Sequence, residues 1–166
     1  MADFRFNMRT HSPDVLDVVS TAFGNDGLNK YTTEADTGKA MILAGEGFHE
    51  LCVGDDEITG FIDTVKGTTV NELNSFGGLK RGGTHPAILG ENQGATPAKV
   101  GDLVVADTQA AAGVKPTDSY LKIAGFGEID IHARVKVGSP TNYKWQVIRV
   151  IGDGLAGSIV YLERLR

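Results

Sequence analysis

The residues best able to do chemistry are four histidines and one cysteine, and their spacing fits no known site. The histidines are His11, His49, His85 and His132; they lie far apart, with no i, i+4 pair and no His-x-His pattern. A zinc site needs four ligands, or three with a water. His49 and Cys52 are three residues apart, a spacing that directs two strand side chains to opposite faces. The sequence therefore predicts no metal centre and no cofactor.

The surroundings of Cys52 in the sequence argue against a reactive thiol. A nucleophilic cysteine needs an electropositive, partly open site that stabilises the thiolate. Nearby acidic residues would instead raise the pKa of this thiol; they are Glu50, Asp55, Asp56 and Glu57. Adjacent acids such as Asp55 and Asp56 also point apart on a strand, which favours solvated turns over acid–base catalysis. We expect a buried structural cysteine and no enzymatic activity.

Charge and glycine patterns argue against several classes of partner. The net charge is −5, and the only basic clusters are Lys80 with Arg81 and the C-terminal ERLR. Nucleic-acid-binding domains carry larger basic patches. The run GGLKRGGTH differs from a phosphate-binding loop, whose amides must open a helix. No stretch approaches the roughly 18 apolar residues of a membrane helix, and the N-terminus lacks the apolar segment of a signal peptide. We expect no nucleic-acid and no membrane partner.

The elements that would position any site are short apolar runs separated by glycine. The chain has 22 glycines among 166 residues, nearly double the average share of roughly 7%. Strand-like runs stand at 39–44, 48–53, 58–65, 102–107, 144–151 and 157–165. The last two flank the turn GDGLA and predict a hairpin. Gly60, inside the third run, predicts a bulge or a backbone too close for a side chain.

The clearest strand pattern is EIDIHARVKV at 128–137. Its odd-numbered positions are apolar and its even-numbered positions are polar, which predicts one face in the core and one in water. The polar face carries His132, Arg134 and Lys136. That face would be a wet sheet surface or, alternatively, a docking face for an acidic neighbour.

The N-terminal part of the chain differs from the rest. We interpret 1–37 as an N-terminal arm and connecting segment, followed by a β-rich domain over 38–166. Within 13–23, Pro13 suits a first helical turn but several valines favour a strand, so both interpretations stay open. Residues 66–100 are long for a loop and should contain short strands or contact other parts. The predicted fold is mostly β: a small antiparallel β-barrel or sandwich in a single globular domain, with at most one or two short helices.

The order of features between residues 38 and 90 follows a known pattern. In order they are a Gly-Lys strand start, a second strand, an acidic turn, a strand of the form I-x-G-F-I-D-x-V, a small-residue segment and a basic pair. They stand at 38–39, 48–53, 55–57, 58–65, 75–79 and 80–81, and VGDLVVAD at 100–107 also fits. This order resembles the core of tailed-phage capsid decoration (cement) proteins.

The resemblance implies a role without catalysis or cofactor. Such a protein is made in the host cytoplasm and lies on the capsid exterior of the virion, where it binds the major capsid protein and clamps neighbouring coat subunits. The resemblance also implies a homo-oligomer, a trimer ahead of a dimer. A clamp would use an arm that becomes ordered on its partner and edges that add strands to a neighbour.

The residues expected to bind the coat or a neighbouring subunit are apolar or basic, and the phenylalanines and arginines among them are types enriched at interface anchors. They are Phe4, Arg5, Phe6, Arg9, Lys80 and Arg81. Two alternative functions stay open. One is another virion structural module, in the tail or baseplate, and the other is a small ligand-binding β-barrel.

Overall fold

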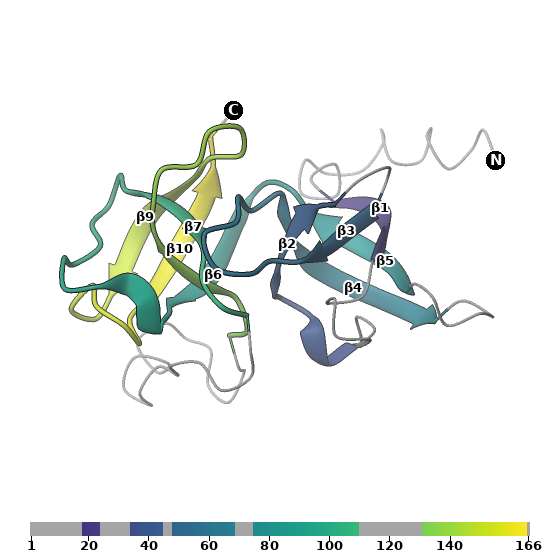
Figure 1. The fold of residues 1–166 in the computed structure, drawn as a ribbon, viewed down its shortest axis with the longest axis horizontal. Coiled ribbons are helices and arrows are strands. Elements are labelled where there is room, and N and C mark those ends of the chain that lie inside the picture. The colour runs from purple at the N-terminus through teal and green to yellow at the C-terminus, as the bar shows by residue number, and fades with distance from the viewer. Residues whose placement is uncertain (1–17, 24–33, 45–47, 69–74, 110–130, 166) are drawn as a thin grey trace.

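The protein folds into two closed, five-stranded β-barrels that lie side by side (Figure 1). The computed structural model describes residues 18–23, 34–44, 48–68, 75–109 and 131–165. The first barrel has the ring order β1-β3-β2-β4-β5, with β1 (Val18–Phe23), β2 (Ala40–Leu43), β3 (Phe48–Leu51), β4 (Gly60–Thr68) and β5 (Ser75–Lys80). The second has the ring order β10-β6-β8-β7-β9, with β6 (Thr84–Leu89), β7 (Leu103–Ala106), β8 (Arg134–Val137), β9 (Trp145–Ile151) and β10 (Ile159–Arg164). The predicted mostly β, barrel-forming fold is confirmed.

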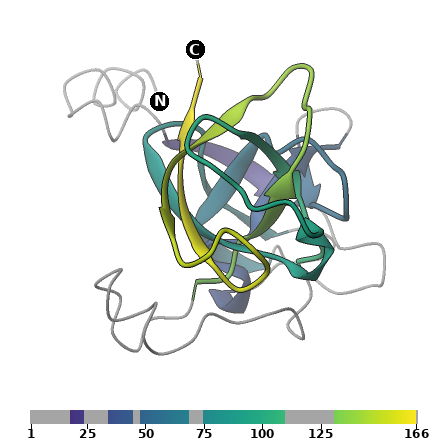
Figure 2. The same cartoon turned by 90° about the vertical axis from the view of Figure 1, so that its left-hand side faces the viewer.

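Helical structure is confined to single turns in the described part of the chain. The helical elements there are two short 3-10 helices, Glu34–Asp36 and Glu91–Gln93. Figure 2 turns the second barrel toward the viewer, so that its strands are seen around their common interior. Within the described residues, no helix is long and apolar enough to cross a membrane.

Most of the strand-like runs form strands where the sequence predicts them. The expected hairpin around GDGLA is the antiparallel pair β9 and β10. The long span 66–100 contains β5, β6 and one 3-10 helix, as its length required. Residues 18–23 form strand β1, which pairs with β5 and β3, so the strand interpretation holds for this part of 13–23. This strand lies inside the interval expected as an arm and connecting segment, and it closes the first barrel.

The prediction for 128–137 was partly wrong. The strand in the described residues is only Arg134–Val137. Arg134 was expected in water but is 5% exposed, whereas Val137 was expected in the core and is 39% exposed. The alternation rule assumes a sheet with one wet face, but Arg134 lies opposite Ile88, which belongs to a buried cluster of the second barrel that also contains Ile131. There the Arg134 guanidinium donates to the carbonyl of Ile131.

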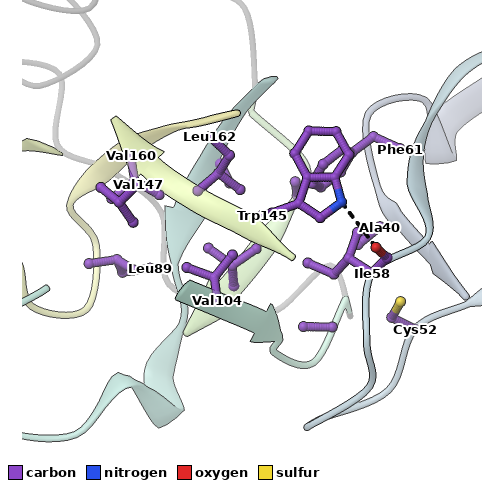
Figure 3. Packing of buried hydrophobic residues seen from close by; sticks show 14 of the residues in the cluster. Ala40, Cys52, Ile58, Phe61, Leu89, Val104, Trp145, Val147, Val160 and Leu162 are labelled. Atoms are coloured by element: carbon purple, nitrogen blue, oxygen red, sulfur yellow. Dashed lines mark hydrogen bonds between the residues drawn. The ribbon is translucent and has the colours of Figure 1, made fainter. Parts of the chain in front are cut away.

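One hydrophobic core continues from the first barrel into the second (Figure 3). Its members from the first barrel are Ala40, Cys52, Ile58 and Phe61; its members from the second include Val104, Trp145, Val147 and Leu162. A smaller cluster around Met41 fills the first barrel, and another around Ile88 lies on the opposite face of the second barrel's strands from the main core. The contact between the two barrels is therefore apolar at its centre.

Gly60 confirms one of its two predicted roles. A Cβ built on it would lie 2.5 Å from the carbonyl oxygen of Lys80 on the neighbouring strand. The bulge of β4 lies further along, between Ile62 and Thr64. The glycine is therefore required by a close backbone approach, which lets β4 and β5 pack tightly beside the second barrel.

Candidate functional site

The contact between the two barrels, here called the seam, is the most elaborate site in the described residues. It consists of 37–40, 52–61 and 81 from the first barrel and of 85, 106–109, 131–136, 141–145 and 164 from the second. All of the predicted partner-binding residues that the structure describes lie at or beside it.

Three aromatic rings occupy the centre of the seam. The ring of Phe61 in β4 stacks on His85 of β6, with centroids 3.9 Å apart and planes inclined by 8°. The same ring meets Trp145 of β9 edge to face, with centroids 4.8 Å apart. Figure 3 shows the indole nitrogen of Trp145 donating across the seam to the carbonyl oxygen of Ile58, at 3.0 Å. The tryptophan is fully buried, so this bond satisfies a donor that water cannot reach.

The loop between β3 and β4 pairs with the second barrel through its backbone. The amide of Asp55 donates to the carbonyl of Ala106, and the amide of Ala106 donates to the carbonyl of Asp56, at 3.0 and 2.9 Å. Asp55 adopts a left-handed conformation, with φ of 69°, which aspartate tolerates better than most residues. Its carboxylate forms an ion pair with Lys136 at 2.7 Å, but most of that carboxylate is in water, so the pair adds little stability.

Glu57 reaches from this loop into the turn before β9. Its carboxylate accepts backbone N–H bonds from Thr141, Asn142 and Tyr143. Partial burial opposes ionisation of this group, but the backbone donors outweigh it and lower the pKa of Glu57. The charged side chain thus fixes the turn of the second barrel against the first.

Polar side chains of the second barrel hold the start of β2. The amide oxygen of Gln109, which is buried, accepts from the backbone N–H of Ala40 at 3.1 Å. A ring nitrogen of His132 lies 2.9 Å from the carbonyl oxygen of Thr37, and His85 lies 3.1 Å from that of Gly38. Of the polar face predicted on 128–137, His132 and Lys136 contact the first barrel of the same chain.

Burial shapes the titration of the groups around the seam. The pKa of His85 is lowered to about 3, chiefly by burial; the bond to Gly38 opposes this change and the charge of Lys80 adds to it. Burial also lowers the pKa of His49, with a contribution from Arg81. Cys52 is 2% exposed, as expected for a structural thiol. Its burial, followed by the negative charge of Asp56, holds the thiol pKa well above its usual value.

The predicted partner-binding residues fall into two groups. Phe4, Arg5, Phe6 and Arg9 lie outside the described residues. Lys80 and Arg81 stand at the end of β5, beside the short linker that leads into β6. The ammonium of Lys80 donates to the backbone of the second barrel at Thr84, whereas the Arg81 side chain is exposed.

Sequence reasoning missed the aromatic centre of the seam. Phe61, His85 and Trp145 belong to three strands that are distant in the sequence, and no local pattern connects them. The single tryptophan was the only signal, because a buried indole usually needs a partner for its N–H. Among the residues with described positions, no three potential metal ligands gather in one place.

The arrangement can hold two barrels in a fixed relation through aromatic packing, backbone pairing and one ionised carboxylate. The comparisons with family models, with curated proteins and with solved structures found no match. The chain's own residues therefore carry the functional argument.

Proposed function

We propose that this protein is a capsid decoration, or cement, protein that binds the major capsid protein on the outer surface of a phage head and stabilises the coat lattice. The observation that carries the proposal is the core shared by the two barrels. A clamp between neighbouring subunits must resist deformation, and a partner that is already rigid loses little conformational entropy on binding. Catalysis and a cofactor form no part of this role.

The residues that carry the sequence resemblance support the proposal by where they lie. The segment 38–90 contains β2 to β5, the linker and the whole of β6. Its acidic turn forms the loop at 53–57 that pairs with the second barrel, and its I-x-G-F-I-D-x-V strand supplies Phe61. The features shared with cement proteins are thus the ones that build the first barrel and its rigid attachment.

The closure of the two barrels limits the ways in which such a protein could bind the coat. Each described strand has a neighbour on both sides, so strand addition would be limited to stretches beyond the shortest pairings, such as 148–151 on the β7 side of β9. Contact with the coat would instead come from the N-terminal arm and from exposed side chains at loops and strand ends. Burial of Phe4 and Phe6 in a coat groove would contribute roughly 1.5–3 kcal/mol each, and Arg5 and Arg9 would meet carboxylates.

The basic pair at the end of β5 consists of Lys80 and Arg81, and Arg81 is the one available to a partner. Lys80 already donates to Thr84 within the chain, at 2.5 Å. Arg81 is exposed, and its position on the linker places it between the two barrels. We therefore assign the partner contact of this pair to Arg81 and a structural contact to Lys80.

Co-sedimentation with undecorated heads tests the proposal. Full-length protein should sediment with the heads, and deletion of residues 1–9 should weaken binding while the thermal stability stays unchanged. Arg81→Ala should also weaken binding, whereas Lys99→Ala, which removes an exposed positive charge elsewhere, should not. Equal binding with and without residues 1–9 would show that the arm does not contribute to binding the heads.

Failure of the full-length protein to bind any cognate head would overturn the proposal. Electron microscopy of the isolated protein would then separate the alternatives. Rings or stacks would indicate a tail or baseplate module, and isolated particles would leave the ligand-binding barrel.

A further inference from the structure

The two barrels have the same strand connectivity. In each, taking strands in chain order, the first pairs with the third in parallel and with the fifth in antiparallel orientation, the second pairs with the third and fourth, and the fourth pairs with the fifth. A shared ring order alone is weak evidence of common descent, because small barrels have few ways to close. The detail within the rings is therefore what matters.

The strand registers of the two barrels coincide. In the parallel pair of the first barrel Ala22 lies opposite Phe48, and in the second Ile88 lies opposite Arg134. Once these four positions are taken as counterparts, the strand pairings that both barrels share assign a counterpart to each residue of the other three strands. This assignment uses Met41–Leu51 with Val104–Val137, Val18–Lys80 with Thr84–Glu163, and Phe61–Lys80 with Gln146–Glu163. The pairing of the second strand with the fourth is not used in it and agrees without a shift: Ala40–Phe61 matches Leu103–Gln146, and Met41–Gly60 matches Val104–Trp145.

A β-bulge occurs at the same place in both barrels. The pairing of β4 with β5 skips Asp63, and the pairing of β9 with β10 skips Ile148. These two residues are counterparts in the register just described. Ring closure does not require a bulge at this position, so its repetition points beyond a common ring order.

The backbone before the second strand is also the same in both barrels. Gly38 and Gly101 are counterparts, and both adopt left-handed conformations, with φ of 89° and 99°. Each donates its N–H to the counterpart carbonyl, Ile62 at 2.7 Å and Val147 at 2.8 Å. Three further bonds repeat: Lys39–Asp36 with Asp102–Lys99, Ile62–Lys39 with Val147–Asp102, and Cys52–Ala40 with Gly138–Leu103.

We infer that the chain is a tandem duplication of one five-stranded barrel, and that the second copy carries an insertion between its second and third strands. The connection between β2 and β3 spans only 44–47, whereas its counterpart between β7 and β8 spans 107–133. The side chains have diverged because the copies meet through different surfaces. Gly60, for example, must leave room for a backbone, while its counterpart Trp145 fills the seam.

Engineered disulfides test the repeated register and bulge, in a Cys52→Ala background that removes the single native cysteine. Beyond the bulge, Lys66 lies opposite Phe76 and Ile151 lies opposite Ile159. Cysteines at 66/76 and at 151/159 should both oxidise to disulfides, because directly opposed strand residues meet the required Cα separation. The matched control pairs 65/76 and 150/159 would be opposed only without a bulge and should stay reduced. Mass spectrometry of the digested protein shows, for each of the four variants, whether the two cysteines form a disulfide.

Disulfides in the bulged register in one barrel and the unbulged register in the other would overturn the inference. Where a variant does not fold, nuclear Overhauser contacts between opposed backbone protons of the unmodified protein report the same four pairs. The inference holds if both barrels show the bulged pairing, and it fails if only one does. It does not rest on binding to phage heads.

Discussion

Acid should weaken the seam through His85, and the structure gives the size of the effect. The imidazole is stacked on Phe61 and bonded to Gly38, with a pKa lowered to about 3 from an ordinary value of 6.5. In the unfolded chain it returns to the ordinary value. Below pH 6.5 the unfolded state therefore binds more protons than the folded state, and the free energy of unfolding falls as the pH falls.

The magnitude follows from the distance between the assay pH and the unfolded pKa. At pH 5 that distance is about 1.5 units, and each unit corresponds to about 1.36 kcal/mol, so His85 should cost about 2 kcal/mol of stability between pH 8 and pH 5. His49, whose pKa is also lowered, acts in the same direction. Glu57 has a lowered carboxyl pKa, so its contribution is lost only below its ordinary value of 4.5, outside this window.

Urea unfolding followed by tryptophan fluorescence measures this effect at the seam itself. Trp145 is the only tryptophan, and its ring packs against Phe61. His85→Gln keeps a donor for the Gly38 carbonyl and removes the titration. The loss of stability between pH 8 and pH 5 should be about 2 kcal/mol larger in the wild-type protein than in this variant. The same loss in both proteins would refute the reasoning.

Three further perturbations probe the same packing. Trp145→Phe should lower the free energy of unfolding by about 1–3 kcal/mol, because the carbonyl of Ile58 loses its buried donor; urea unfolding followed by circular dichroism measures this, and a change within experimental error would contradict it. Gly60→Ala should cost about 1–3 kcal/mol through overpacking, whereas Gly54→Ala, where a Cβ meets nothing within 4 Å, should be nearly neutral by thermal unfolding. Cys52 should react with a thiol reagent far more slowly in the folded protein than in urea at neutral pH, and fast labelling of the folded protein would indicate an open site.

The sequence predicted local structure well where one rule decided the outcome. The glycine-bounded runs became strands, and Gly60 marked a close backbone approach, because turn chemistry and steric exclusion act over a few residues. The alternation rule failed at Arg134, because its strand partner Ile88 is distant in the sequence and belongs to a buried cluster. For residues 18–23 the sequence left helix and strand both open, because β-branched residues competed with helix-start signals. Pairing with β5 favoured the strand.

The division into two barrels was beyond sequence reasoning for a similar reason. Each barrel closes through pairing of its first and fifth strands, which are separated by most of its length. The duplication is hardly visible in the amino-acid sequence, because counterpart residues such as Gly60 and Trp145 pack against different neighbours. The partner-binding residues of the arm stay a prediction from composition and resemblance.

Ring closure has a consequence for how the protein behaves in solution. Segments such as WQVIRVI in β9 and IVYLER in β10 combine high β-propensity with low net charge, a composition that promotes intermolecular sheet formation when a strand edge is open. In the second barrel β10 pairs along nearly its whole length with β6 on one side and with β9 on the other, which denies this segment to other chains as a template for aggregation. Mutations that disrupt the pairing of β6 with β10 should therefore produce insoluble protein before they produce a soluble unfolded chain.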